Sequence, residues 1–511
     1  IASAALPASA TLTATATDAH IRLREARSAR DHRVSAAGQL LVNLTAALSA
    51  LAYQSVLDSS GMVSLHPWTP SVWAAGLGLM ALFNVRTLLS PPESPPPTDH
   101  PWRSLLTIPL YANLGFWAAL WFLAGERHPA GLAIYLDKLA EQANLYIQVG
   151  LYVWAGMLLK QSRLAHLSFD LLRPWSFPPE ILAALVVVLS AVPTAWSGAS
   201  GIFVIAAGGT IYEELRRAGA RNQLALAATA MSGSLGVVLS PCLLVVIVAA
   251  LNKQVTTAEL FGVGRAVFFL SASLFVAVLL LRRTTPWELR DAAAARRDFF
   301  AAVHAILPYT AIFIAVILFF GLVLDTWFNE HTAPTILLVL LLTLVAWERR
   351  PDRPLLPRME EATTETTVHI GALLSLMAFS AAFGGIVERS DIMSAVPTDL
   401  GGPLPTMLLL TAALVLIGML MDPYGAVILV SATLAHVAYA NGVHPVHFWM
   451  TVLVAFELGY LTPPVALNQL LTASVVGPAA DDPDLPPNPT FYDRHERVLL
   501  PVTVMATALL I

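Results

Sequence analysis

The chain has 511 residues, of which 56% are hydrophobic and 12% are charged. That charged share is about half of the share in a typical globular protein, and the mean hydropathy is +0.67. Too little polar material is present to cover a soluble particle of this size, so a membrane protein is expected. The net charge of −5 comes without a basic stripe, which argues against nucleic acid as a partner. Cys242 is the only cysteine, which excludes an internal disulfide and a multi-cysteine metal site.

Apolar stretches of about 20 residues, the length that crosses a bilayer as a helix, recur along the chain. Residues 1–35 come before them and lack an apolar core long enough for a signal peptide, so they are expected to form a poorly specified cytoplasmic leader. The fold class predicted from the pattern is an all-α polytopic membrane protein. Spans are expected at about 36–57, 70–90, 104–124, 142–160, 222–251, 258–281, 303–325, 333–347, 367–388, 447–475 and 495–511.

Two further apolar stretches, 179–212 and 404–439, are each long enough for two helices. Turn-forming residues interrupt them, Ser197-Gly198-Ala199-Ser200 in the first and Asp422-Pro423-Tyr424-Gly425 in the second. Each stretch therefore predicts a re-entrant helical hairpin. Irregular backbone is tolerated at membrane depth only where protein or a water-filled cavity solvates it, which makes both tips candidate sites.

Arginines in short loops predict which side of the membrane is cytoplasmic. Residues 282–300 and the segment after 347 are both rich in arginine, and two expected spans separate them, so both are expected in the cytoplasm. Counting the spans back from there also places residues 1–35 in the cytoplasm. The arginines of the two loops are Arg282, Arg283, Arg290, Arg296, Arg297, Arg349, Arg350, Arg353 and Arg358.

The two hairpins occupy matching frames, because each precedes a span that Gly and Pro interrupt, at 236–242 and at 459–465. The hairpin tips are 225 residues apart (197 to 422) and the breaks are 223 apart (241 to 464), which predicts an internal duplication. Arg389 is the only basic residue that flanks the second hairpin, whereas the first has many, so the copies are expected to be inverted. The basic flanks of the first hairpin are Lys160, Arg163, Arg173, Arg216, Arg217 and Arg221.

The predicted organisation follows from these repeats. A leader at 1–35 precedes two N-terminal transmembrane helices in 36–99 and a first repeat in 100–282, which contains the first hairpin. Connecting helices with cytoplasmic loops occupy 283–366, and a second, inverted repeat with the second hairpin occupies 367–511.

Inverted repeats with paired interrupted helices are the architecture of secondary transporters, which bind substrate and coupling ions near the bilayer midplane. A broken helix frees carbonyls that can coordinate Na+ and exposes amide ends that suit a carboxylate. No G-x-x-x-x-G-K-[ST] sequence occurs, so coupling to an ion gradient is expected in place of ATP hydrolysis. The predicted cation-binding residues lie at the tips and the breaks: Ser197, Gly198, Ser200, Gly236, Ser240, Pro241, Asp422, Gly425, Gly459, Thr462, Pro463 and Pro464.

Three segments resemble one family of transporters. Residues 197–219, with Ser-Gly-Ala-Ser followed by Gly208, Glu214, Arg216, Arg217 and Gly219, resemble a hairpin of the large membrane subunit of TRAP (tripartite ATP-independent periplasmic) transporters, within the ion-transporter superfamily. Residues 457–468, Glu-Leu-Gly-Tyr-Leu-Thr-Pro-Pro-Val-Ala-Leu-Asn, resemble that subunit's second broken-helix motif, and residues 442–448 resemble the segment before it. The resemblance covers roughly residues 140–511. The chain departs from the pattern at Ala199, where a serine is usual, and at Ser240-Pro241-Cys242, where the family has Pro-Pro-Ser.

The resemblance implies an elevator-type carrier, driven by a sodium gradient, that imports a small organic anion through a bacterial or archaeal inner membrane. Carboxylates and sulfonates are the substrates that it implies, with Ser200, Gly201 and Asn468 as contacts. It also implies a periplasmic solute-binding protein and a small four-helix membrane subunit as partners. Three expected spans precede the family-like region, and the last of them, at 104–124, is assigned to the large subunit. Because only two spans remain for it, the small subunit is expected as a divergent remnant in 36–99 or as a separate chain. Na+ is the coupling ion, and no other cofactor is expected.

Several of these residues also have a structural interpretation. Ser197 and Ser200 either bind a ligand or cap the hairpin helices, and Asp422 either binds a cation or caps a helix. Glu457, on an otherwise apolar helix, either braces the bundle through a hydrogen bond or handles a proton or cation. A hydroxyl ligand is impossible at Cys242, which is expected to be a small packing residue.

Two other functions fit parts of the pattern. A stand-alone ion-coupled anion carrier of the same superfamily would work without a binding protein. A polytopic membrane enzyme would need a catalytic constellation within the bilayer, and the sequence has neither H-E-x-x-H nor an obvious pair of acids. A transporter, and not an enzyme, is therefore expected.

Overall fold

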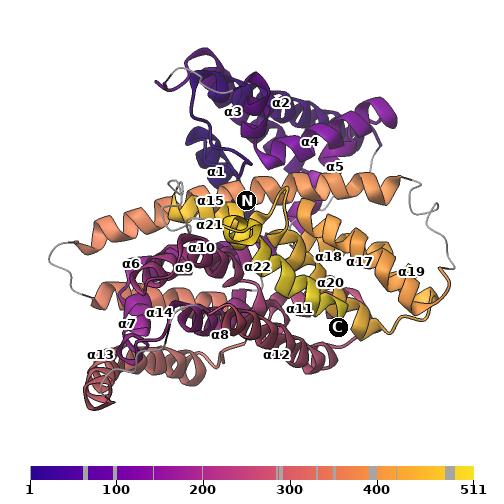
Figure 1. Cartoon of the computed structure of the whole chain (residues 1–511). Helices are drawn as coiled ribbons and strands as arrows, with labels where there is room; N and C mark the ends of the chain where they lie inside the picture. Colours follow the sequence, from indigo (N-terminus) through magenta and orange to yellow (C-terminus); the bar gives the residue numbers. More distant parts are fainter. Residues whose placement is uncertain are drawn as a thin grey trace. The chain divides into compact units, whose positions relative to one another are not determined.

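The computed structural model describes residues 2–60, 67–95, 100–141, 143–197, 200–283, 286, 292–329, 332–348, 353–390, 400–421, 423–477 and 489–511. All regular elements in these ranges are helices (Figure 1). Six helices are long and apolar enough to cross a membrane, or up to eight if each of two bent pairs is one span. The predicted all-α, multi-pass membrane protein is confirmed at this level.

The N-terminal helices overlap the first expected spans, but the helix at 29–60 begins inside the expected leader, and the helix at 131–141 was not expected. A helix occupies residues 2–16, inside the expected leader, and the span expected at 104–124 consists of two helical pieces bent by 92°. In chain order the elements are α1 (Ala2–Ala16), α2 (Ala29–Ser60), α3 (Thr69–Leu89), the 3-10 helix η1 (Pro101–Thr107), α4 (Leu110–Leu120), the π-helix η2 (Trp121–Gly125), α5 (Gly131–Glu141) and α6 (Ala143–Gln161).

The middle of the chain contains the first predicted hairpin and the first interrupted span. Its elements are α7 (Leu164–Asp170), η3 (Arg173–Trp175), α8 (Pro179–Ser197), α9 (Ser200–Arg217), α10 (Asn222–Met231), η4 (Leu235–Val238), α11 (Leu243–Leu251) and α12 (Thr257–Leu281). The connecting helices are α13 (Ala292–Leu318), η5 (Phe319–Val323), α14 (Ala333–Trp347) and α15 (Leu355–Arg389).

The last part of the chain contains the second predicted hairpin and the second interrupted span. Its elements are α17 (Pro403–Leu420), α18 (Pro423–Ala432), α19 (Leu434–Ala440), α20 (Pro445–Leu461), α21 (Leu467–Val476) and α22 (Phe491–Leu510). The helix ends recur at a nearly constant spacing: α8 ends 223 residues before α17, α9 begins 223 before α18, and η4 ends 223 before α20.

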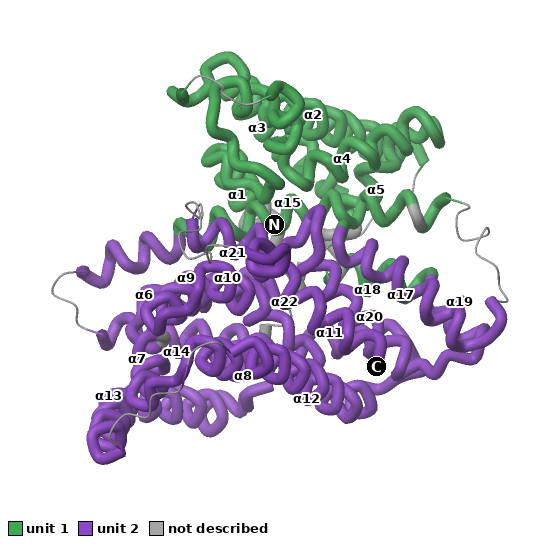
Figure 2. Tube along the Cα trace, in the orientation of Figure 1, with its two compact units in different colours: residues 1–147, 364–397, 420–433 green, residues 148–363, 398–419, 434–511 purple. Residues whose placement is uncertain are grey.

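The chain divides into two compact units (Figure 2). Unit 1 comprises residues 1–147, 364–397 and 420–433, and unit 2 comprises residues 148–363, 398–419 and 434–511. The helix α15 contributes residues to both units. Each unit gathers segments that are far apart along the chain, and the domain boundaries predicted from the sequence stay predictions.

Unit 1 is held together by close contacts between helix backbones. A Cβ atom on Gly371 of α15 would overlap the carbonyl oxygen of Ala10 in α1, so only glycine allows this approach. A Cβ atom on Gly115 of α4 would likewise overlap the side chains of Val42 and Phe379. Small residues at such contacts are typical of helix packing in membranes, where dispersion forces replace much of the hydrophobic driving force.

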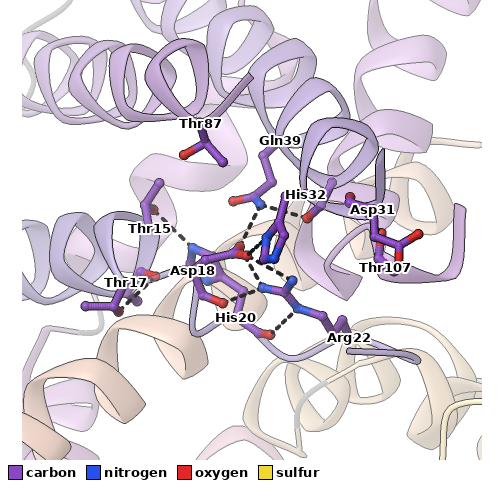
Figure 3. Close-up of polar contacts among 12 residues, drawn as sticks. Thr15, Thr17, Asp18, His20, Arg22, Asp31, His32, Gln39, Thr87 and Thr107 are labelled. Carbon is purple, nitrogen blue, oxygen red and sulfur yellow. Dashed lines mark hydrogen bonds and ion pairs between the residues drawn. The ribbon is translucent and has the colours of Figure 1, made fainter. Parts of the chain in front are cut away.

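A polar network fixes the turn between α1 and α2 within unit 1 (Figure 3). The buried guanidinium of Arg22 pairs with the Asp18 carboxylate at 2.7 Å. The same carboxylate accepts a hydrogen bond from Gln39 at 3.4 Å and lies 3.3 Å from the His32 ring. His20 is buried beside Tyr111, with 4.6 Å between the ring centroids, and its Nε2 lies 3.0 Å from the Thr15 hydroxyl.

Burial and charge shift the acidity of two groups in this turn. Burial and, to a smaller extent, the Arg22 charge lower the pKa of His20 to about 3, against the opposing effect of Asp18. Burial raises the pKa of Asp18, but the hydrogen bond and the charge of Arg22 outweigh it, and the result lies below the ordinary value. At neutral pH the network therefore contains a neutral imidazole and an ionised Asp18–Arg22 pair.

Unit 2 has an apolar core built largely from alanine, valine and leucine. α8, α9 and α10 contribute Ala183, Val187, Leu215, Ala225 and Ala228, each at 0% exposure. The later helices α12, α20 and α22 close this core, with Phe275, Leu461 and Leu500 also fully buried. Small side chains on the first three helices allow the hairpin arms to approach the first interrupted helix closely, which positions the site described next.

Candidate functional site

The first interrupted helix loses its regular backbone twice. α10 ends at Met231, the short helix η4 covers 235–238, and α11 begins at Leu243 after extended backbone at Leu239. The two halves of the span, 222–238 and 243–251, are bent by 42°. The Ser240–Pro241 peptide bond is cis, and Ser240 is exposed while Cys242 is fully buried.

The second interrupted helix has a single break. α20 ends at Leu461, Thr462 is extended, and α21 begins at Leu467 after Ala466, whose backbone is left-handed with φ of +48°. The Pro463–Pro464 bond is cis, and both prolines are exposed. The Thr462 hydroxyl donates to the Leu458 carbonyl at 2.6 Å, so it satisfies a carbonyl at the helix end.

Both arms of the first hairpin pack against the first interrupted helix. A Cβ atom on Gly233 would overlap the Ser200 carbonyl at the start of α9, and one on Gly236 would overlap the Ala191 carbonyl of α8. The Thr194 hydroxyl of α8 donates to Ser190 at 2.8 Å and reaches the Ser232 carbonyl at 3.5 Å. Glycine at 233 and 236 is therefore required for this approach of the backbones.

The start of α9 also meets the second interrupted helix. The Ser200 hydroxyl donates to the Asn468 Oδ1 at 3.3 Å, and the Asn468 Nδ2 donates to the Ser234 hydroxyl at 3.4 Å. Asn468 is fully buried, and Ser200 and Ser234 are 2% and 1% exposed. Gly201 lies between these groups, where a Cβ atom would stand 2.7 Å from Leu471 and 3.8 Å from the Asn468 Oδ1. One hairpin arm and both interrupted helices thus meet at a single buried polar cluster.

Glu457 of α20 belongs to the same cluster. Its side chain is 2% exposed, and the hydroxyls of Ser200 and Ser234 lie within hydrogen-bonding reach of its carboxyl group. Its Oε2 atom has no hydrogen-bond partner. We call Ser200, Ser234, Glu457 and Asn468 the junction cluster. All four supply oxygen atoms, which are the ligands that hard cations prefer.

The structure brings some of the sequence-predicted site residues together and leaves others apart. Ser200, Gly201 and Asn468 lie together, and Gly236 lies against α8 behind them. Gly459 packs elsewhere, with α17, where a Cβ atom would stand 2.7 Å from the Val415 carbonyl. Ser240, Pro241, Thr462, Pro463 and Pro464 occupy the linkers between helix halves, and Gly425 lies in α18 within unit 1. Gly198 and Asp422 lie outside the described residues, and the structure describes only the backbone of Ser197.

Sequence reasoning missed Gly233 and Ser234 as site residues. The available signal was the run Ser232-Gly233-Ser234 inside an otherwise apolar stretch, which resembles the composition of the first hairpin tip. The Gly/Pro pattern at 236–242 predicted only the later part of the break.

The chain was compared with protein families and with known proteins. The model of the family described as "Tripartite ATP-independent periplasmic transporter, DctM component" matches residues 131–511. Residues 1–130, with the polar network of unit 1, lie outside that match.

Known relatives are similar over much of the same region. The C4-dicarboxylate TRAP transporter large permease protein DctM of Vibrio cholerae is 23% identical over 317 residues, covering 58% of this chain and 69% of the relative. The protein of the same name from Pseudomonas aeruginosa is 22% identical over 301 residues, with the same two shares. The isethionate TRAP transporter permease protein DctMQ of Oleidesulfovibrio alaskensis is 25% identical over 143 residues, covering 27% of this chain and 21% of that protein.

Proposed function

The chain belongs to the DctM family of tripartite ATP-independent periplasmic transporters, and from this premise we propose that it is the permease of a sodium-coupled uptake system for a small organic anion. Membership confirms the resemblance found in the sequence and assigns the chain to transport and not to enzymes. The relatives are named for C4-dicarboxylates and for isethionate, which are carboxylates and a sulfonate. We propose a substrate of these two classes.

The observation that carries the proposal is the junction cluster. Ser200 belongs to the first hairpin, Ser234 and Asn468 belong to the two interrupted helices, and hydrogen bonds of 3.3 and 3.4 Å join the three. Such a meeting of broken helices places free carbonyls and amide ends beside polar side chains. A sodium ion and an anion bound there would neutralise each other, which lowers the cost of holding both inside the membrane.

We propose that the two halves are inverted repeats with re-entrant hairpins and that the binding region moves across the membrane by an elevator mechanism. The constant spacing of 223 residues between corresponding helix ends supports the duplication. The basic flanks of the first hairpin, in contrast to those of the second, support opposite orientations.

The partners proposed are a periplasmic solute-binding protein and a small membrane subunit, which together with this chain would make a tripartite system in the cytoplasmic membrane. The small subunit is either a separate chain or is partly replaced by the helical segments in residues 36–99, which belong to α2 and α3. One relative, the isethionate permease, bears the combined name DctMQ.

Uptake into proteoliposomes tests the proposal. Radiolabelled succinate and isethionate are the probes, with a sodium gradient imposed or absent and with the binding protein added or omitted. Uptake is expected only when the sodium gradient and the binding protein are both present. The Ser200→Ala variant, which loses the hydrogen bond to Asn468, is expected to take up substrate about tenfold more slowly or worse. Ser168→Ala, at an exposed position of α7, is the matched control and is expected to behave like the wild type.

Two outcomes would contradict parts of the proposal. Uptake that ignores the sodium gradient would exclude sodium coupling. Uptake that proceeds without the binding protein would favour a stand-alone carrier of the same superfamily.

A further inference from the structure

The buried carboxylates of unit 2 differ in how their charge is compensated. Glu214 pairs with Arg173 at 2.7 Å, Glu348 pairs with Arg358 at 3.0 Å, and Glu496 pairs with Arg221 at 3.0 Å. Each of these glutamates is at least nine-tenths buried. Glu457 is buried equally well, but among the described residues no lysine, arginine or histidine nitrogen lies within 4 Å of it.

The helices packed around α20 do not supply a missing cation to Glu457. Their charged and titratable groups form no ion pair with it in the part of the chain that the structure describes, and its nearest polar neighbours are the hydroxyls of Ser200 and Ser234. The groups concerned are Glu259 and Arg265 on α12, His436 and Tyr439 on α19, and Tyr492, Asp493, Arg494, His495, Glu496 and Arg497 on α22. Among the described residues, the buried Cys242 thiol lies close enough to Glu457 to interact with it electrostatically.

An isolated carboxylate in such a position is costly. Removing an ion from water costs several kcal/mol even after the protein relaxes, and this cost is recovered only when another charge or several hydrogen bonds compensate it. The Glu457 Oε2 atom has no hydrogen-bond partner, and the Ser200 hydroxyl already donates to Asn468. The cluster therefore has a free acceptor oxygen inside a buried set of oxygen ligands.

The chemistry of the cluster indicates which ion suits it. Carboxylate, hydroxyl and amide oxygens are hard ligands. A single negative charge is neutralised by one monovalent cation, whereas a divalent ion would leave a buried net positive charge.

We propose that Glu457 is a ligand of a monovalent cation, Na+, held at the junction cluster together with Ser200, Ser234 and Asn468. This inference rests on the proposed sodium coupling and adds to it a charged ligand on α20. The first hairpin arm and both interrupted helices would then be joined through one ion.

Binding of radioactive sodium to the purified full-length chain tests the inference without a substrate or a partner. Equilibrium dialysis gives the Kd and the number of ions bound for the wild type, Glu457→Gln, Glu457→Asp and Ser234→Ala. Glu457→Gln keeps the size of the side chain and removes its charge, so the affinity at this site is expected to fall by about tenfold or more. Ser234→Ala is expected to weaken binding less, and Glu457→Asp is expected to retain part of the affinity.

The matched control is Glu361→Gln, the same substitution at an exposed position of α15 in unit 2. It is expected to bind sodium like the wild type. Gel filtration and the thermal midpoint establish that each variant is folded, and Ser234→Ala provides a second perturbation of the cluster if Glu457→Gln fails to fold.

The outcomes separate this inference from the proposed function. If the wild type binds sodium and Glu457→Gln binds it with the same affinity and stoichiometry, the role of Glu457 is excluded while sodium coupling stands. If the wild type itself binds no sodium, the proposed sodium coupling fails, and the role of Glu457 fails with it.

Discussion

Arg22 in unit 1 and Glu457 in unit 2 are both buried in polar clusters, but the two clusters compensate the charge differently. In unit 1 the guanidinium of Arg22, 5% exposed, is paired with Asp18 at 2.7 Å and also donates to the His20 carbonyl at 3.2 Å. In unit 2 the carboxyl group of Glu457, 2% exposed, has hydroxyl neighbours and one oxygen without a partner.

The difference distinguishes a cluster that supports the fold from the cluster that we propose to bind an ion. A buried charge that only supports the fold is expected to be paired, because leaving it unpaired costs more than its replacement by an apolar residue. Arg22 meets this expectation, and so does Arg358 in unit 2, which pairs with Glu348 and donates to the Gln161 carbonyl at 2.7 Å. Glu457 does not meet it, and the cation proposed above would supply the missing partner.

In unit 1 the largest effect is expected from Asp18→Asn, which leaves the Arg22 charge buried without a counter-charge. The Asp18 side chain is 27% exposed, so solvent screens part of the effect. The free energy that docks the α1–α2 turn is expected to fall by about 2 to 3 kcal/mol. Trypsin cleavage after Arg22, Arg24 and Arg27 is then expected to accelerate by roughly 30-fold to 150-fold, since it tracks the open population.

The control for this prediction is Asp58→Asn, the same change on the exposed surface of α2. It is expected to leave the cleavage rate unchanged. An equal, slow rate in both variants would show that the Asp18–Arg22 pair contributes little to docking of the turn.

A smaller effect is expected from acid, through His20. Its pKa is about 3 in the folded protein and about 6.5 in an exposed histidine, so the opened turn binds more protons between these values. The contribution of neutral His20 to the stability of the docked turn is therefore fully present above pH 6.5 and declines as the pH falls toward 3. At pH 5 the loss is about 2 kcal/mol. The pKa of Asp18 is also lowered, so its contribution declines only below its ordinary value of 3.8.

Hydrogen exchange of residues 17–28, corrected for the intrinsic pH dependence of exchange, measures this loss between pH 7 and pH 5. His20→Phe keeps the ring beside Tyr111 and removes the titration, so its protection is expected to change far less over the same range. A wild type and a variant with the same pH dependence would assign the effect to another group.

The sequence predicted the helices of both units far better than it predicted their clusters. Apolar runs predict membrane helices because the bilayer requires them locally, and Ser-Gly and Gly-Pro patterns predict breaks for the same local reason. α1 was not predicted because residues 2–16 form no long apolar run, and what positions this helix is the contact of Ala10 with Gly371 on distant α15. The meeting of Ser200 with Asn468 joins residues 268 positions apart, and no local pattern encodes it.

The same reasoning explains why Glu457 was recognised but not assigned. An acid in an apolar run indicates a special role. The choice between a bracing hydrogen bond and a ligand depends on its neighbours, Ser200 at the start of α9 and Ser234 just before η4, and only the fold brings these residues to Glu457. Tertiary packing decided likewise that Gly459 faces α17 and not the junction cluster.

The smallest effect on stability is expected from Glu457→Gln, the counterpart in unit 2 of Asp18→Asn. Because no charged partner is left behind, the free energy of unfolding without sodium is expected to match that of the wild type within about 1 kcal/mol, or to exceed it. Glu348→Gln, at the paired glutamate of the same unit, is the contrasting variant and is expected to lose about 3 kcal/mol, since Arg358 would remain buried. Added sodium should raise the midpoint of the wild type and of Glu348→Gln but not that of Glu457→Gln, because a ligand stabilises only a protein that binds it. If Glu457→Gln is strongly destabilised and added sodium does not change the midpoint of the wild type, Glu457 is instead a structural brace of the bundle.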